Sequence, residues 1–328
     1  MHDGVKKFGL NVAASRMTTG NHLLYGKLEA ALENFFDCES ALLVSNGYVT
    51  NLVVAQALAG DFSHVIVDEK AHGSLMDAAI FFECPIMKFK HHDIEDLQRI
   101  VGRIGKNTKP ILLADGVFSH DGSLSPLNKY LKVLPKSAVL LVDDAHGAGT
   151  LGDTGKGTIE LQAIDRRRVI QTITLSKAFG AYGGAILGSR PLREKILSNS
   201  RMFVGSTPLP LPLANAALTA VQVLKTEKNL RSRLVQNVNY VKSALSKAGV
   251  KISPPPSPLV AIVPETQDEA EKLKARCLAN GVFPSLIKYG EGPQNGYFRF
   301  AISSEHTRKQ LEALLKAIIG KHYKYPKN

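Results

Sequence analysis

Apolar residues in the first two thirds of the chain follow two spacings, one typical of amphipathic helices and one typical of buried strands. Leu24, Leu28, Leu32 and Phe35 recur every three or four residues, which predicts a helix. Continuous apolar runs predict strands over 41–45, 64–68, 86–90, 110–114, 138–143, 169–174 and 184–188, and helices are predicted over 48–59 and 73–82. Buried strands that alternate with helices favour a mostly parallel sheet covered by helices on both faces.

The last third of the chain has a different pattern. Long helices are predicted within 208–248, and the Ser-Pro-Pro-Pro-Ser-Pro stretch at 253–258 interrupts them. A small α+β domain is predicted beyond it, with strands at 259–263 and near 297–300 and helices at 267–280 and from about 305. A chain of 328 residues is longer than one compact core usually supports. We therefore predict an α/β protein with a large domain at 1–227 and a small C-terminal domain at 228–328.

Composition and charge exclude few function classes. Hydrophobic residues make up 44% and charged residues 21% of the chain. No apolar run approaches the roughly 18 residues that cross a bilayer, and no signal-peptide core is present. Cys38, Cys84 and Cys277 fit no metal-ligand or disulfide pattern, so we expect no metal and a cytoplasmic protein. The basic residues behind the net charge of +12 are dispersed apart from Arg166–Arg168, so we expect no nucleic-acid partner.

Two predicted strand ends carry residues that suit one cofactor. Lys177 lies in Thr-Leu-Ser-Lys-Ala-Phe-Gly (174–180), where small neighbours let its amine approach an aldehyde. Asp143 ends the run at 138–143 and can hold a protonated ring nitrogen. An amine that forms an imine and an anion that keeps a pyridine ring electron-poor are what pyridoxal phosphate (PLP) requires.

With these motifs the chain resembles the α-oxoamine synthases, a group of fold-type-I PLP enzymes. The group includes aminooxononanoate synthase, aminoketobutyrate CoA ligase, serine palmitoyltransferase and aminolevulinate synthase. The resemblance runs from about Phe8 to about His306. It rests on five motifs in order: Ser-Arg-Met-Thr-Thr-Gly-Asn-His (15–22), Ser-Asn-Gly-Tyr-Val-Thr-Asn (45–51), Asp-Gly-Val-Phe-Ser-His-Asp-Gly (115–122), Val-Asp-Asp-Ala-His-Gly (142–147) and the lysine motif.

The resemblance implies a catalytic set around PLP. Lys177 is the expected Schiff-base lysine. The resemblance selects Asp143, rather than its neighbour Asp144, as the partner of the pyridinium nitrogen. This ion pair is expected to keep the ring nitrogen protonated, because a nearby anion favours the charged form. His146 is expected to hydrogen-bond the phenolic oxygen of the cofactor, and His72 to stack on the ring and take part in proton transfer.

Phosphate donors are expected from three segments. Asn46-Gly47-Tyr48 precedes a predicted helix, whose free N–H groups suit an anion, and glycine allows close approach of the backbone. Thr174 and Ser176 add hydroxyl groups from the lysine motif. Ser206 and Thr207 match a family segment that reaches the phosphate of the opposite subunit, which implies a homodimer with shared active sites.

Two further residues are assigned by the resemblance. Ser119 is expected to contact the ring oxygen or the imine region. Arg299 is expected to clamp the substrate α-carboxylate, because a guanidinium fork suits a planar carboxylate. The implied reaction is decarboxylative condensation of a small amino acid with an acyl-CoA thioester to give an α-amino ketone. Retro-aldol cleavage of a β-hydroxy amino acid and transamination are alternatives within PLP chemistry.

Two other classes of protein share part of this pattern. The stretch 147–152 matches Gly-x-Gly-x-x-Gly of NAD enzymes, but 144–146 separate it from the strand and no helix start follows. A non-catalytic binding protein on this fold would be expected to have lost Lys177 or Asp143, and both are present.

Three features depart from the family pattern and bear on the acyl-CoA partner. Family members usually have several dozen more residues before the part that resembles Phe8, so we expect a truncated start or a remodelled substrate entrance. Tyr25 stands where many members have histidine, and 287–292 replaces a proline-rich loop that precedes the carboxylate arginine.

Overall fold

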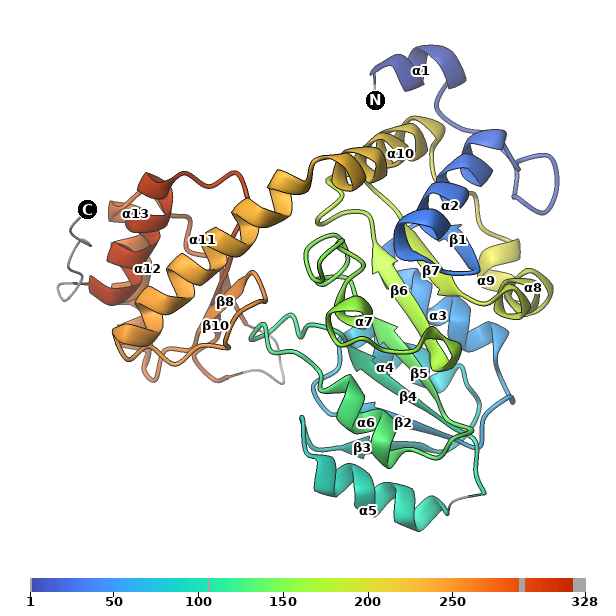
Figure 1. The fold of residues 1–328 in the computed structure, drawn as a ribbon, viewed down its shortest axis with the longest axis horizontal. Coiled ribbons are helices and arrows are strands. Elements are labelled where there is room, and N and C mark those ends of the chain that lie inside the picture. Colours follow the sequence, from blue (N-terminus) through green and yellow to red (C-terminus); the bar gives the residue numbers. More distant parts are fainter. Residues whose placement is uncertain (1, 106, 289–292, 321–328) are drawn as a thin grey trace. The chain divides into compact units, whose positions relative to one another are not determined.

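The computed structural model describes residues 2–105, 107–288 and 293–320, so residues 289–292 of the replaced loop lie outside the described part. The chain forms two compact units (Figure 1). The first comprises Met1–Phe118 and Leu124–Glu227, and the second comprises Ser119–Ser123 and Lys228–Asn328. The short segment Ser119–Ser123 thus belongs to the second unit although its chain neighbours belong to the first.

A mixed sheet is the centre of the first unit. Its described strands lie in the order β1-β7-β6-β5-β4-β2-β3, and β3, β2, β4, β5 and β6 are mutually parallel. β7 runs antiparallel to both of its neighbours, which makes β1 parallel to β6. The strands are β1 (Ser40–Val44), β2 (His64–Asp68), β3 (Ile86–Phe89), β4 (Pro110–Asp115), β5 (Val139–Asp143), β6 (Val169–Thr174) and β7 (Gly184–Gly188).

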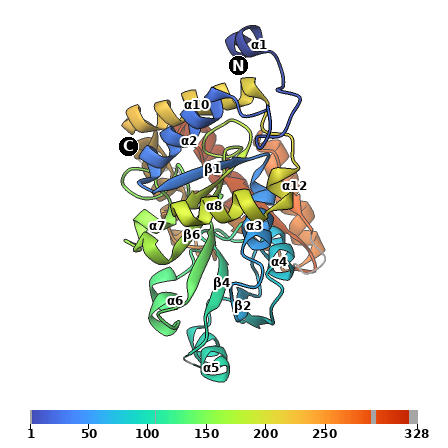
Figure 2. The same cartoon turned by 90° about the vertical axis from the view of Figure 1, so that its right-hand side faces the viewer.

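Alternate strand residues pack on the two faces of this sheet because successive side chains of a strand point to opposite sides. Val67 and Leu113 belong to one apolar core, which α3 (Gly47–Ala57) and α4 (Gly73–Ile80) cover. Ile66 and Leu112 belong to the other core, on the side of α5 (Ile94–Ile104) and α6 (Leu127–Val133). Figure 2 shows α3 and α4 on one side of the strands and α6 and α7 (Thr158–Leu161) on the other.

The helices of the first unit mostly begin at residues whose side chains cap the free N–H groups. They are α1 (His2–Phe8), α2 (Leu23–Phe36), α3 (Gly47–Ala57), α4 (Gly73–Ile80), α5 (Ile94–Ile104), α6 (Leu127–Val133), α7 (Thr158–Leu161), the 3-10 turn η1 (Arg166–Arg168), α8 (Arg190–Asn199), α9 (Arg201–Val204) and α10 (Leu211–Thr226). Asn46 caps α3 by accepting a hydrogen bond from Val49 N, and His72 caps α4 by accepting one from Ser74 N. Both caps lie where the chain leaves a strand of the central sheet.

The second unit is a small α+β structure. An antiparallel sheet in the order β8-β10-β9 packs against helices around a single apolar core that includes Val260, Phe298 and Leu315. Its elements are α11 (Lys228–Lys247), β8 (Leu259–Ile262), α12 (Gln267–Ala279), β9 (Leu286–Ile287), β10 (Tyr297–Ala301) and α13 (Arg308–Ile319). α13 begins slightly later than predicted because Thr307 and Gln310 form a capping box at its start.

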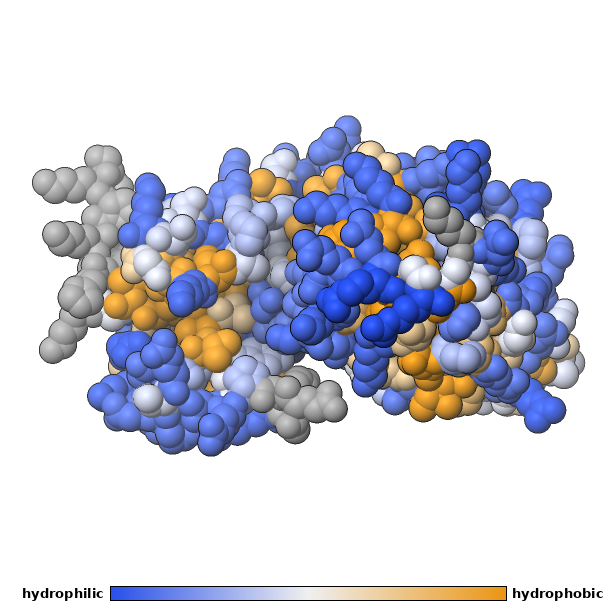
Figure 3. Space-filling view, turned by 90° about the horizontal axis from the view of Figure 1, so that it is seen from below, coloured by the Kyte–Doolittle hydropathy of each residue, from blue (hydrophilic) through white to orange (hydrophobic). Residues whose placement is uncertain are grey.

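The surface and the cysteines add little to the functional picture. On the face seen in Figure 3, hydrophilic residues predominate, and apolar residues form smaller patches among them. Within the described part of the chain, no helix has the length and apolar character needed to span a membrane. Cys38, Cys84 and Cys277 are all free thiols.

Candidate active site

A cavity of about 110 Å³ opens at the carboxyl edge of the seven-stranded sheet. It is lined by Gly47, Tyr48, His72, Ser74, Asp115, Asp143, Ala145, His146, Thr174 and Lys177. Every one of these residues belongs to the first unit. Of the lining residues, Ser74, Asp115 and Ala145 are those to which the sequence had assigned no role. Carboxyl ends of parallel strands are the usual ligand side of such sheets.

Asp143 is a buried carboxylate that is held in place by three donors. Its Oδ2 accepts hydrogen bonds from Asn51 Nδ2 at 2.7 Å and Ser74 Oγ at 3.4 Å, and its Oδ1 accepts one from Ala145 N at 3.1 Å. These contacts fix the orientation of the carboxylate. This side chain is therefore suited to present a fixed negative charge to the cavity.

Asn51 and Thr172 form a second layer of support behind Asp143. Thr172 Oγ1 donates to Asn51 Oδ1 at 2.7 Å, which orients the amide so that Nδ2 faces Asp143. The same Nδ2 donates to Ser74 Oγ at 2.9 Å. Asn51 and Thr172 are fully buried. The sequence had not given them roles, although a polar residue inside the apolar run 169–173 was the available signal.

Asp144 lies apart from this cavity. Its Oδ2 accepts hydrogen bonds from Thr158 N at 2.8 Å and Gln171 Nε2 at 2.7 Å. Burial raises the pKa of Asp144 to about 7, although these two hydrogen bonds oppose the shift. Glycines surround it closely: a Cβ added at Gly157 would come within 1.9 Å of Asp144 Oδ2. Of the two carboxyl groups, Asp143 lines the cavity and Asp144 does not.

Asp115 is the second carboxyl group in the cavity. It ends β4 and pairs in register with Asp143 at the end of β5. Its Oδ2 accepts a hydrogen bond from His72 N at 2.8 Å. Burial raises the pKa of Asp115 well above its usual value, the nearby Asp143 carboxylate adds to the rise, and Lys177 opposes it. The raised pKa favours the protonated form of Asp115.

The imidazole of His72 has one tautomer fixed by its surroundings. Its Nδ1 lies 3.2 Å from Ser74 N, and an amide N–H can only donate, so Nδ1 accepts. The neutral ring therefore carries its proton on Nε2. Tyr48 lies edge-on to this ring, with ring centroids 6.0 Å apart, and its hydroxyl donates to Asp77.

The start of α3 offers an anion site beside the lysine loop. The Asn46 side chain satisfies Val49 N, which leaves the first amides of the helix, those of Gly47 and Tyr48, for another acceptor. A Cβ added at Gly47 would come within 2.7 Å of Thr174 Cβ, so only glycine permits this approach. Thr174 Oγ1 in turn accepts a hydrogen bond from Ser176 N at 3.2 Å.

Lys177 sits in a tight loop between β6 and β7. Gly180 N donates to Lys177 O at 2.9 Å, and Ala181 N donates to Leu175 O at 2.9 Å. Behind this loop, a Cβ added at Gly149 would come within 2.8 Å of Ala178 Cβ. Gly147 packs against Asp144, Gly149 against the lysine loop and Gly152 against Glu160, so these glycines do not open a nucleotide-binding helix.

The structure does not place Ser206 and Thr207 at this cavity. Both are exposed and follow α9, and Ser206 Oγ donates to Met202 O. The segment is anchored by Tyr25, whose buried hydroxyl donates to Leu209 O at 2.6 Å. The tyrosine that departs from the family pattern thus holds the segment that carries Ser206 and Thr207.

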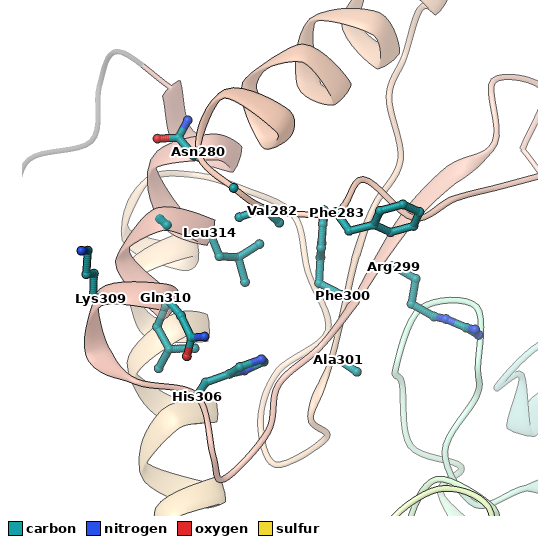
Figure 4. Close-up of a pocket in the computed structure, with 13 residues that line it drawn as sticks. Asn280, Val282, Phe283, Arg299, Phe300, Ala301, His306, Lys309, Gln310 and Leu314 are labelled. Carbon is teal, nitrogen blue, oxygen red and sulfur yellow. The ribbon is translucent and has the colours of Figure 1, made fainter.

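Ser119 and Arg299 belong to the second unit and contact each other there. Arg299 Nη1 donates to Ser119 O at 3.1 Å. β10, which carries Arg299, is the central strand of its sheet. A separate cavity of about 470 Å³ in this unit is lined by Phe283, Phe300, His306 and Leu314 among others. Figure 4 shows the guanidinium of Arg299 pointing away from His306 and Leu314.

The residues of the first-unit cavity fit PLP. Lys177 supplies an amine, Asp143 a buried anion for a ring nitrogen, and the glycine cradle at Gly47 a set of N–H donors for a phosphate. Thr174 lies against that cradle.

Comparisons with known proteins agree with this fit. The family described as aminotransferase class I and II matches residues 10–318. The 8-amino-7-oxononanoate synthase of Thioalkalivibrio sulfidiphilus is 33% identical over 321 residues, which cover 97% of this chain and 82% of the relative. The enzyme of the same name from Thermoanaerobacter pseudethanolicus is 32% identical over 324 residues, 97% of this chain and 82% of the relative.

Solved structures show the same similarity. Serine palmitoyltransferase from S. paucimobilis, determined with PLP and myriocin, superposes with a TM-score of 0.90 at 28% identity, over 97% of this chain and 81% of that one. An 8-amino-7-oxononanoate synthase from Francisella tularensis gives a TM-score of 0.83 at 26% identity, over 97% of this chain and 90% of that one. The predicted fold class is thereby confirmed.

Proposed function

Since the chain belongs to the aminotransferase class I and II family and, within it, to the α-oxoamine synthases, we propose that it joins a small amino acid to an acyl-CoA thioester with loss of carbon dioxide. It is a PLP-dependent acyltransferase. Within the chain, the observation that carries this proposal is the cavity in which Lys177 meets the buried, triply hydrogen-bonded carboxylate of Asp143.

Each residue of the cavity has a role in this proposal. PLP, when bound, withdraws electrons from the α-carbon of the amino acid and so stabilises a carbanion there. The Lys177 amine attaches the cofactor and moves protons at the α-carbon. Asp143 holds the ring nitrogen protonated, and the amides of Gly47 and Tyr48 hold the phosphate. His72 donates from Nε2, the atom that its contact with Ser74 leaves protonated.

The names of the relatives suggest which substrates to test first. In 8-amino-7-oxononanoate the ketone at C7 neighbours C8, which carries both the amine and the terminal methyl group. Decarboxylative condensation gives this arrangement from alanine and a seven-carbon acyl group with a terminal carboxylate. Serine with a palmitoyl group is the second pair, from the name serine palmitoyltransferase.

We extend the proposal to a cytoplasmic homodimer with shared active sites. Support comes from the exposed Ser206 and Thr207, which precede Pro208 and Pro210 in an extended segment that Tyr25 anchors. The exposed Thr207 can meet a second copy of the chain there, whereas Ser206 Oγ would first have to exchange its hydrogen bond to Met202 O. Arg299 is proposed as the clamp for the α-carboxylate, and Ser119 as a further contact to the cofactor.

A substrate screen tests the function. Alanine, glycine and serine are each combined with acyl-CoA esters that differ in length and in the presence of a terminal carboxylate, and release of CoA thiol is followed. We expect thiol release that requires both substrates and PLP. Conversion of the amino acid to its keto acid without thiol release would instead indicate transamination, and release of an aldehyde from a β-hydroxy amino acid would indicate retro-aldol cleavage.

A further inference from the structure

The segment Ser119–Ser123 is the tip of a hairpin whose base is tied to the active-site edge of the sheet. At the base, Val117 and Leu124 form an isolated antiparallel bridge, and Gly116 N donates to Asp143 O at 2.8 Å. The tip itself belongs to the second unit. The base of the hairpin therefore belongs to the first unit and its tip to the second.

The tip is locked into a single turn within the second unit. Asp121 Oδ1 accepts a hydrogen bond from Ser123 N at 2.8 Å, which closes the turn over Gly122. Gly122 has a φ of +73° and is buried. A Cβ added there would come within 2.9 Å of Leu259 Cβ and 3.0 Å of Ser257 Oγ. Only glycine therefore allows the tip to lie this close to β8.

A buried lysine of the second unit, Lys242, lies near Asp121 of the tip. Lys242 Nζ donates to Ser253 Oγ at 3.2 Å and to Pro254 O at 3.1 Å. Burial lowers the pKa of Lys242 to about 8, and the nearby Asp121 opposes that shift. The charge of Asp121 thus helps to keep Lys242 protonated, which adds an electrostatic attachment to the tip.

The docked tip fixes the guanidinium of Arg299. Arg299 Nη1 donates to Ser119 O at 3.1 Å, and Arg299 lies on β10, paired with Ala261 of β8. A free arginine loses much rotamer freedom when it binds a ligand. Because the Ser119 carbonyl already holds one N–H group of Arg299, the side chain loses this rotamer freedom on folding and not on binding. The guanidinium has further N–H groups that can bind a carboxylate.

We propose that the 119–123 tip is a positioning element for Arg299, with Gly122 and Asp121 as the residues that set it, and that it thereby determines affinity for the amino-acid substrate. This inference rests on the proposed function of Arg299 as the α-carboxylate clamp. It assigns no contact with substrate to Gly122 or Asp121 themselves.

The test compares two glycine variants with the same backbone strain. Gly122→Ala introduces a clash, whereas Gly249→Ala, at a φ of +76° in the same unit, meets nothing within 4 Å. We expect Gly122→Ala to raise the KM for the amino acid about three- to tenfold, with kcat and the KM for the acyl-CoA within about twofold of wild type. Gly249→Ala should leave all three constants at wild-type values.

A second readout is independent of catalysis. The rate at which phenylglyoxal modifies Arg299, measured by peptide mass spectrometry, should increase in Gly122→Ala and remain at the wild-type value in Gly249→Ala. Asp121→Ala, which loosens the turn without adding bulk at Gly122, serves if Gly122→Ala does not fold. Equal amino-acid KM values and equal modification rates in the tip variant and in Gly249→Ala would overturn the inference. Absence of condensation by the wild type would instead refute the proposed function.

Discussion

Asp115 and Asp143 stand opposite each other at the carboxyl ends of two neighbouring parallel strands, and both line the cavity that contains Lys177. Their surroundings differ. Asp143 accepts hydrogen bonds from Asn51, Ser74 and Ala145, whereas a single one, from His72 N, reaches Asp115 among the described contacts. Two acidic groups with different surroundings commonly divide the charged and the protonated role between them.

This division predicts opposite outcomes for two conservative substitutions. Asp143→Asn removes the fixed charge from the cavity, and we expect condensation to slow by roughly a hundredfold or more. Asp115→Asn replaces a carboxyl group whose raised pKa favours the protonated form by a neutral group of similar shape, so its rate should stay within a fewfold of wild type. Steady-state kinetics of both variants at saturating PLP measures the contrast. Comparable losses in the two variants would contradict the assignment.

Asp144 gives a prediction for stability as a function of pH. Its pKa is about 7 in the folded protein, compared with about 3.9 in an unfolded chain. Between these values the native state keeps a proton that the unfolded state has released, so the free energy of unfolding falls as the pH rises from about 4 to about 7. The slope from one such group is at most about 1.4 kcal/mol per pH unit.

The side chain of Asp144→Asn cannot ionise, so the free energy of unfolding of this variant should fall less steeply than that of wild type between about pH 4 and about pH 7. Urea unfolding of both proteins at several pH values between 4 and 8 measures the difference. Asp153→Asn, at an exposed position, is the control and should keep the wild-type slope. If Asp144→Asn and wild type decline in parallel, Asp144 does not hold the proton in question.

Much of the fold followed from apolar spacing alone, because most strands of the central sheet are runs of largely buried residues; β3, of which only Phe89 is buried, is the exception. The predicted strands at 64–68, 169–174 and 184–188 coincide with β2, β6 and β7. α5 was missed, although Asp93 provides a cap at its start. The direction of β7 was also beyond the sequence, since a buried antiparallel strand has the same apolar pattern as a parallel one.

The candidate site also contains residues that the sequence could predict and residues that it could not. Lys177, Asp143 and His72 were recognisable because motifs mark them, and the structure brings them to one cavity. Thr172 and Asp115 could not be assigned, because their importance comes from strands that are adjacent only in the folded sheet. The roles of all these residues stay predictions.

Attachment of the cofactor to Lys177 is tested directly by substitution. Lys177→Ala should bind PLP through the phosphate and ring contacts but form no covalent link. We expect borohydride treatment to fix PLP on wild type and to leave Lys177→Ala unlabelled, as shown by peptide mass spectrometry. A reducible adduct on a different lysine of the variant would show that the wrong amine was chosen.

Shared active sites predict rescue between two inactive proteins. Lys177→Ala subunits mixed with Ser206→Ala/Thr207→Ala subunits form heterodimers in which one site carries both lesions and the other carries neither. We expect part of the wild-type activity to return after subunit exchange. A fully active monomer at assay concentration, or no rescue after proven exchange, would count against shared sites.

The central claim is that carbon–carbon bond formation and decarboxylation occur together on one amino acid. With a substrate pair that releases CoA thiol, the amino acid is labelled at its carboxyl carbon, and labelled carbon dioxide and thiol are measured in the same reaction. The account predicts one molecule of labelled carbon dioxide for each thiol released, with none from Lys177→Ala. Thiol release while the label remains in the product would contradict the account.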